Sequence, residues 1–252
     1  MSTMAAVFPR SKPWQSLDLI GGLTRADISL ADDELQKHVA LLEFDMNTEF
    51  DSENFCIYLA ERTKNGMSFT PEFGEFEKTW RRDELNHYVG YRRLLAMCGP
   101  EDEDALHKRV TSRPVDFGPV KDFLRDEFSI CLVLAYDEIT TANSCRIDFP
   151  MFGSFGNPIF VEWIRRVARD EAYHFLNIVD VIKRRHAHRV PEAREFMKKL
   201  LNFDGDGHGY GATFVMDHDP ERFPRATLEK LMEKVLKAIS TADEIAVEVE
   251  VE

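Results

Sequence analysis

The chain contains few cysteines, and none of them forms a paired motif. The four cysteines are Cys56, Cys98, Cys131 and Cys145. Without a Cys-x-x-Cys pair, neither a zinc site nor a redox dithiol is expected. Scattered cysteines on helical faces are usually buried free thiols, which favours a reducing, cytoplasmic compartment.

Long apolar runs are also lacking, and no signal peptide is expected from the first residues. No stretch approaches the roughly 20 apolar residues that a membrane-spanning helix requires, and residues 1–10 have neither the basic start nor the apolar centre of a signal peptide. The formal net charge is −13, whereas general nucleic-acid binding depends on basic surface. We therefore expect a soluble cytoplasmic protein with no membrane span and no nucleic-acid partner.

Strand-like patterns are nearly absent, and helical periodicity predominates. Caps and breakers mark helix ends, as at Asn65-Gly66 and Thr70-Pro71. The predicted long helices cover residues 30–63, 70–97, 119–146 and 158–187, and shorter ones cover 102–110, 191–202 and 226–240.

This pattern predicts an all-α fold, a long four-helix bundle with additional shorter helices, in a single domain over residues 1–252. The stretches 149–156 and 204–225 are rich in helix breakers and are predicted to be loops. The expected parts are an irregular arm at 1–28, the four-helix core at 30–190, C-terminal helices and a loop at 191–240, and an acidic tail at 241–252.

The pattern Arg-Asp-Glu-x-x-His occurs twice, each time inside a predicted long helix. A helix places residues three apart on one face, so Glu84 points the same way as His87, and Glu171 the same way as His174. A single Glu-x-x-His is common on a charged helix, whereas two identical copies are hard to obtain by chance. In four-helix bundles, such pairs are typical of centres that bind two metal ions.

A centre of this kind needs one more carboxylate from each of the other two helices. Glu49 precedes Glu84, and Glu138 precedes Glu171, at nearly equal separations. Asp137 is the one acidic residue close to Glu138. Glu49 has more rivals on its own helix, namely Glu43, Asp45, Asp51 and Glu53.

Iron accepts both oxygen and imidazole ligands, and four carboxylates would offset the charge of two ions. The predicted ligands are the bridging Glu84 and Glu171, Glu49 with His87 for one ion, and Glu138 with His174 for the other. An iron–manganese pair would use the same set. Asp83 and Asp170 precede the motif glutamates, where a carboxylate can orient a metal-bound imidazole. The alternative for these two aspartates is a solvated charge on a helix surface.

These residues resemble the ligand helices of the soluble acyl-carrier-protein desaturases, which are ferritin-like di-iron proteins. Residues 45–49 are similar to the first ligand helix of that family and residues 80–87 to the second. Residues 138–141 and 170–174 are similar to the third and fourth. The resemblance covers roughly residues 40–190.

The resemblance implies particular roles for two further residues. Thr141 matches a threonine beside the site of oxygen activation. Residues 12–15 are similar to a family segment whose tryptophan contacts the aspartate of the fourth helix. By this analogy Trp14, Asp170 and His87 form a path for electrons. The alternative is that Trp14 only anchors the arm on the bundle.

The family resemblance also implies an activity and partners. Its members are homodimeric di-iron enzymes that take electrons from a ferredoxin-like donor, activate O2 and remove hydrogens from an acyl chain on acyl carrier protein. A flavin reductase is the alternative electron donor. Two other functions stay open: a di-iron hydroxylase or N-oxygenase of specialised metabolism, and a ferritin-like iron-binding or peroxide-scavenging protein.

The substrate is expected to reach the ions between helices, past residues within two turns of a ligand. The alternative for most of these positions is an ordinary place in the core. The expected lining residues are Met46, Phe50, Phe55, Cys56, Leu134 and Thr141.

Overall fold

The computed structural model describes residues 8–205, 216 and 218–241. Within these ranges the chain forms helices and no strands, which confirms the all-α prediction. The α-helices are α1 (Ser16–Ile20), α2 (Asp32–Lys64), α3 (Pro71–Cys98), α4 (Glu103–Thr111), α5 (Glu127–Ser154), α6 (Pro158–Arg185), α7 (Val190–Gly205) and α8 (Arg225–Ser240). Short 3-10 helices lie at Arg25–Asp27, Gly118–Phe123 and Ala187–Arg189.

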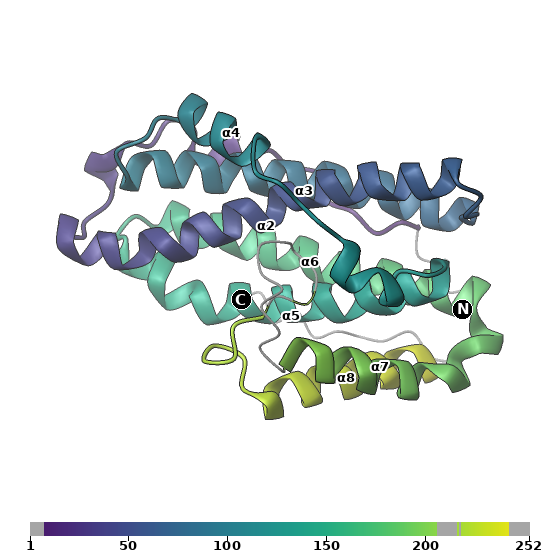
Figure 1. Ribbon diagram of the computed structural model, residues 1–252. Coiled ribbons are helices and arrows are strands. Elements are labelled where there is room, and N and C mark those ends of the chain that lie inside the picture. The colour runs from purple at the N-terminus through teal and green to yellow at the C-terminus, as the bar shows by residue number, and fades with distance from the viewer. Residues whose placement is uncertain (1–7, 206–215, 217, 242–252) are drawn as a thin grey trace, which may run out of the picture.

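The larger helices are arranged as three layers of pairs (Figure 1). α2 packs against α3, and α5 packs against α6, with the two helices of each pair running in opposite directions. α3 and α6 contact each other across the two pairs, and α7 and α8 cover α5 from the other side. The four long helices thus pair in the order in which they follow one another along the chain.

Side-chain caps fix several of the helix ends. The Thr70 hydroxyl accepts a hydrogen bond from the backbone N–H of Phe73 at the start of α3. Asp126 accepts one from the N–H of Ser129 at the start of α5, at 2.9 Å. Such caps satisfy N–H groups that have no partner within the helix. After α2, Gly66 adopts a φ of 97°, which glycine tolerates without steric cost.

The start of the third long helix was wrongly predicted to follow Gly118-Pro119 directly. Residues Gly118–Phe123 form a 3-10 helix instead, and α5 begins at Glu127. Pro119 carries the proline signal of a helix start, but the side chain that caps α5 is Asp126. The capping carboxylate therefore sets this boundary.

The predicted loop at 149–156 is largely helical. α5 continues through Pro150 and ends at Ser154. Phe152 is fully buried, and its ring centroid lies 5.7 Å from that of Trp163 on α6. This packing outweighs the helix-breaking tendency of the proline.

The described part of the predicted irregular arm, residues 8–28, contains the short helix α1 and the 3-10 helix Arg25–Asp27. Ile20 is fully buried, and the Ser16 hydroxyl donates to the backbone carbonyl of Asn86 at 2.7 Å, which ties α1 to α3. Part of the predicted loop at 204–225 belongs to α7. The remaining predictions for residues 206–215, 217 and 242–252 lie outside the described residues.

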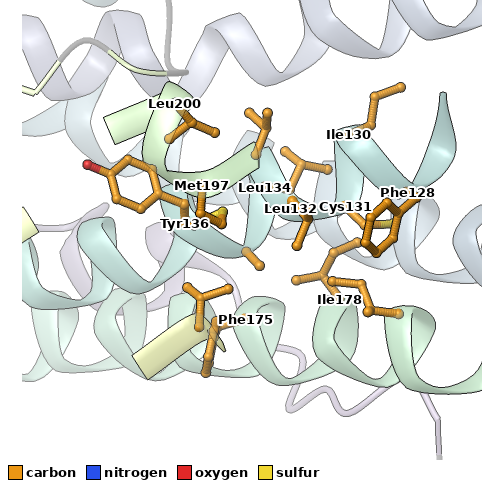
Figure 2. Packing of buried hydrophobic residues seen from close by; sticks show 14 of the residues in the cluster. Phe128, Ile130, Cys131, Leu132, Leu134, Tyr136, Phe175, Ile178, Met197 and Leu200 are labelled. Atoms are coloured by element: carbon orange, nitrogen blue, oxygen red, sulfur yellow. The ribbon is translucent and has the colours of Figure 1, made fainter. Parts of the chain in front are cut away.

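α5 is buried on all sides along about its first three turns. Every residue from Glu127 to Glu138 is buried, which explains the apolar run at 130–135. No described helix combines the length and apolarity needed to cross a membrane. Figure 2 shows the side chains of α5 packed with those of α6 and α7, among them Phe175, Ile178, Met197 and Leu200.

The two helix pairs approach closely where α3 meets α6. A Cβ atom at Gly90 would overlap the indole ring of Trp163. Trp163 packs edge-on against Tyr91, with ring centroids 4.9 Å apart, and its Nε1 donates to the Ser16 hydroxyl at 3.0 Å. The missing side chain at position 90 therefore lets α3 and α6 lie near enough for their motif residues to face each other.

Candidate metal centre

All six predicted ligands meet in one buried region between the helix pairs. α2 supplies one glutamate and α5 another, while α3 and α6 each supply the Glu and His of their motif. None of the six is more than 7% exposed. These residues are Glu49, Glu84, His87, Glu138, Glu171 and His174.

The ligand atoms form two overlapping groups, and within each group they all lie within 4.8 Å of one another. Glu84 and Glu171 belong to both groups, as the bridging assignment requires. The other members are Glu49 and His87 in one group, and Glu138 and His174 in the second.

The spacing of these atoms matches that of neighbouring ligands on one metal ion. His87 Nδ1 lies 3.0 Å from Glu171 Oε1 and 3.3 Å from Glu49 Oε2. His174 Nδ1 lies 3.1 Å from Glu84 Oε1. Two ligands at right angles on an octahedral ion, each about 2.1 Å from it, are about 3.0 Å apart.

Four of these buried atoms make no hydrogen bond with any described residue: Glu49 Oε2, Glu84 Oε1, His87 Nδ1 and Glu171 Oε1. Buried polar atoms are normally paired, because leaving one unpaired costs about 1–3 kcal/mol. All four belong to the same ligand group. One cation among them would satisfy all four, so the donor set fits a metal ion.

The centre concentrates negative charge away from water. Burial, together with repulsion from Glu171, raises the pKa of Glu84 well above its usual value. Burial also raises the pKa of Glu49 and of Glu138. Burial alone would lower the pKa of His87, but the Glu49 carboxylate and its neighbours raise it. Metal ions compete with protons for such atoms, so cations would offset the same charge.

The candidate metal centre offers the donor atoms of four carboxylates and two imidazoles. Comparison with protein-family models, curated proteins and solved structures finds no match for this chain. Oxygen and imidazole donors of this kind suit iron or manganese, whereas thiolate-rich sets suit zinc or iron–sulfur clusters.

Each motif aspartate contacts the histidine of the other motif copy. Asp170 Oδ2 lies 3.4 Å from His87 Nε2, and Asp83 Oδ2 lies 3.4 Å from His174 Nε2. In both rings Nδ1 faces the ligand group, so Nε2 is the atom through which a carboxylate can fix the ring orientation. Both aspartates thus lie where the sequence predicts such a role.

The motif arginines hold the N-terminal arm over the centre, a role that the sequence analysis missed. Arg82 donates to the aspartate beside it and to the Ser11 hydroxyl, the latter at 2.6 Å. Arg169 donates to its neighbouring aspartate and to the carbonyl of Lys12, the latter at 3.1 Å. The repetition of arginine at the same motif position is the signal that points to a shared role.

Trp14 connects this arm to the centre. Its Nε1 donates to Asp170 Oδ2 at 2.5 Å, and its ring centroid lies 6.4 Å from that of His87. Burial opposes ionisation of Asp170, but His87, Trp14 and Arg169 together lower the pKa of this carboxyl. A chain of contacts therefore runs from the half-buried Trp14 through Asp170 to His87.

A cavity of about 430 Å³ lies between α2 and α5, and Glu49 and Thr141 form part of its wall. Along α2 the lining follows Glu49 in steps of four residues, through Asp45 and Leu41 to Lys37. This stripe is a signal that could have identified the lining from the sequence. The predicted lining residues that do not contact this cavity are Met46, Phe50, Phe55, Cys56 and Leu134.

Those five residues pack elsewhere. Phe55, Cys56 and Leu134 belong to the larger core cluster, in which Phe55 packs against Trp80 and Phe117, and Met46 belongs to the core around Trp163. Phe50 packs against Tyr88, with ring centroids 5.0 Å apart.

A third group of possible ligands comprises Glu127, Cys131 and His186. The Glu127 carboxylate already accepts hydrogen bonds from the Thr70 hydroxyl at 2.7 Å and is 2.8 Å from His186 Nε2. Burial raises the pKa of Cys131 well above its usual value, which disfavours a thiolate. This group ties α3, α5 and α6 together as a structural contact.

Proposed function

We propose that this protein is an O2-dependent di-iron oxidase with a ferritin-like four-helix core. The pair of overlapping ligand groups, which share Glu84 and Glu171, carries the proposal. Carboxylates from four helices, with a histidine three residues after two of them, are the ligand arrangement of di-iron bundle proteins. A cytoplasmic location agrees with the free cysteines among the described residues.

Each of the six ligands would bind one or both of the metal ions. Glu84 and Glu171, which belong to both groups, would be shared by the two ions, Glu49 and His87 would complete one site, and Glu138 and His174 would complete the other. When bound, the irons supply the reduction of O2 and the removal of hydrogen from an unactivated bond. The protein shields the ligands from solvent, and Asp83 and Asp170 fix the orientation of the two imidazole rings. Manganese in one site is the alternative.

The residues around the centre would serve substrate and electrons separately. Thr141 lies on the cavity wall beside Glu49, so its hydroxyl can donate a hydrogen bond on the substrate side. Trp14, Asp170 and His87 lie on the arm side, where they would carry electrons inward. The proposed donor is a ferredoxin-like protein or a flavin reductase, and the proposed assembly is a homodimer.

The overall reaction needs two electrons from that donor. In a desaturation, the substrate gives up two hydrogens, and O2, two protons and two electrons end as two waters. In a hydroxylation or N-oxygenation, one oxygen atom enters a C–H or N–H bond and the other leaves as water. The family resemblance implies an acyl substrate on acyl carrier protein.

An iron-storage function is a weaker candidate. Storage requires a path for iron but no site for an organic molecule. The cavity that reaches Glu49 and Thr141 has a volume of about 430 Å³, which lies within the range of about 300–1,000 Å³ that is typical of small-molecule sites. This cavity favours an oxidase that acts on an organic substrate.

The proposal is tested by O2 consumption. Protein loaded with Fe(II) without oxygen is mixed with O2 and a chemical reductant, beside the variant Glu171→Ala and the surface control Glu162→Ala. We expect rapid iron-dependent O2 uptake in the wild type and the control, and none above background in Glu171→Ala. Equal uptake in all three proteins would overturn the proposal.

A further inference from the structure

We infer that Tyr91 is a redox-active residue of the proposed centre, which gives up one electron and its phenolic proton while O2 is reduced and so becomes a neutral tyrosyl radical. The inference rests on the proposed function. It adds a residue that is neither a metal ligand nor part of the path through Trp14. Tyr91 forms part of the wall of the cavity between α2 and α5, as do Glu49 and Thr141.

The helix α3 places Tyr91 beside the metal ligands. Tyr91 follows His87 by four residues, so the two side chains lie on one face of α3, with their Cβ atoms about 5–6 Å apart. Glu49, which would complete the same metal site as His87, lies on the wall of the same cavity as Tyr91. The phenol is therefore near enough to this site for an electron to pass without a carrier in between.

The Tyr91 hydroxyl differs from those of the other buried tyrosines. The Tyr88 hydroxyl lies 2.8 Å from His107 Nδ1, and the Tyr136 hydroxyl donates to Asp204 at 2.6 Å. A buried tyrosine usually has such a partner, but no described residue forms a hydrogen bond with the Tyr91 hydroxyl. Because this side chain borders the cavity, its hydroxyl is available to water, O2 or a bound molecule.

The surroundings of the Tyr91 ring suit a radical. The side chain is only 2% exposed, and the ring of Trp163 meets it edge-on with centroids 4.9 Å apart, which fixes its orientation. Burial, together with the nearby Asp45 carboxylate and Cys145, raises the pKa of the phenol well above its usual value. The phenol thus keeps its proton until it is oxidised, and bulk solvent has little access to the radical.

Cys145 is the other readily oxidised side chain on the described wall of the cavity. It is only 3% exposed, and burial raises the pKa of its thiol well above the usual value. Oxidation of a cysteine depends on its thiolate character and exposure, and both are low here. Tyr91 is therefore the better electron donor of the two.

The electrons and protons of this step balance. Reduction of O2 to two waters takes four electrons and four protons. When no substrate is bound, two ferrous ions give two electrons and an external donor gives one. The O–H bond of Tyr91 breaks and supplies the fourth electron with one proton, and solvent supplies the other three protons. The radical returns to tyrosine when it takes a hydrogen atom from a molecule in the cavity.

The radical is detected by electron paramagnetic resonance (EPR). Metal-free protein is loaded with two equivalents of Fe(II) per chain without oxygen, mixed with O2 and one equivalent of ascorbate, and frozen at intervals. We expect a transient tyrosyl signal whose hyperfine splitting narrows when the protein is produced with ring-deuterated tyrosine. This isotope effect identifies a tyrosine independently of any substrate or product.

Variants assign the signal to one residue. Tyr91→Phe should lower it about tenfold or more with both irons still bound, because the lost hydroxyl forms no hydrogen bond with a described residue. Tyr88→Phe is the matched control on the same helix, since Tyr88 is buried but does not line the cavity, and it should keep the signal. Cys145→Ala should keep it as well. Thermal melting and iron content show whether each variant is folded and loaded.

The outcomes separate this inference from the proposed function. A tyrosyl signal that persists in Tyr91→Phe, or a radical that ignores deuteration and disappears in Cys145→Ala, would overturn the inference about Tyr91. So would two bound irons that O2 oxidises with no tyrosyl signal, although the di-iron proposal would stand. Absence of bound iron would overturn the proposed function itself.

Discussion

The α2–α3 and α5–α6 pairs contribute the same set of ligands, yet their surroundings differ. α5 is buried throughout Glu127–Glu138 and is covered by α7 and α8. On α2, by contrast, Glu49 forms part of the cavity wall. The histidine of the first pair, His87, is connected through Asp170 to Trp14.

This contrast shows that a symmetric ligand set can lie in an asymmetric protein. The ion held by Glu49 and His87 would be near both the cavity and the arm. The ion held by Glu138 and His174 would be enclosed by packed helices. Repetition of a motif thus predicts where metal binds, while the surroundings of each copy decide what reaches it.

Loss of a shared ligand should have the largest effect, because it removes a donor from both groups. We expect Glu84→Ala and Glu171→Ala each to lower bound iron from two per chain to fewer than one. Iron analysis after anaerobic loading and gel filtration is the measurement. Glu75→Ala on α3 is the exposed control, and normal iron content in Glu84→Ala would argue against a bridging role.

Loss of a ligand that belongs to one group only should affect one ion only. Such variants therefore allow the two metal sites to be studied separately. We expect Glu49→Ala and Glu138→Ala each to retain about one iron per chain, with different Mössbauer parameters for the ion that remains. Identical spectra for the two variants would mean that the two surroundings are equivalent to the metal.

The motif aspartates should show a smaller and unequal effect. We expect Asp83→Asn and Asp170→Asn to weaken iron binding about 10–100-fold, the usual cost of changing a group that orients a metal-bound histidine. Asp170→Asn should also slow reduction of the oxidised centre by a one-electron donor, because it interrupts the contact with Trp14. Stopped-flow reduction of both variants tests this difference, and equal rates would remove Trp14 from the proposed path.

The smallest expected effect is on the stability of the contact between α3 and α6. A methyl group at Gly90 would overlap Trp163, whereas a methyl group at Gly74 on the same helix has free space. We expect Gly90→Ala to lower the free energy of unfolding by about 1–3 kcal/mol, and Gly74→Ala to raise it by up to about 1 kcal/mol. Urea denaturation measures both, and an unchanged stability in Gly90→Ala would contradict the close approach of α3 and α6.

The sequence predicts much of the helix pattern because that information is local. The cap at Thr70 and the period of the motif residues can be read directly from the chain, whereas the Asp126 cap of α5 was missed because Gly118-Pro119 carries a competing start signal. The course of α5 through Pro150 was missed, since it depends on aromatic packing against α6 that no local pattern reveals.

In the candidate site, too, local sequence patterns reveal some residues, and others depend on contacts between distant segments. Glu84, His87, Glu171 and His174 are marked by repetition, and the structure brings them together with the two predicted glutamates. Of the predicted lining residues only Thr141 lies on the cavity wall, and the wall also includes Arg222, from a segment far along the chain whose position depends on tertiary packing. The arginines that hold the arm were missed because their partners at Ser11 and Lys12 are equally distant in sequence.

Anaerobic titration of the metal-free protein with isotopically enriched Fe(II), followed by exposure to O2 and Mössbauer spectroscopy in a strong magnetic field, tests the central claim most directly. The proposed centre predicts saturation at two irons per chain and, after oxidation, two ferric ions coupled to a diamagnetic ground state, because Glu84 and Glu171 belong to both ligand groups and would be shared by the two ions. No iron uptake, or ferric ions that remain magnetically independent, would contradict a shared di-iron centre.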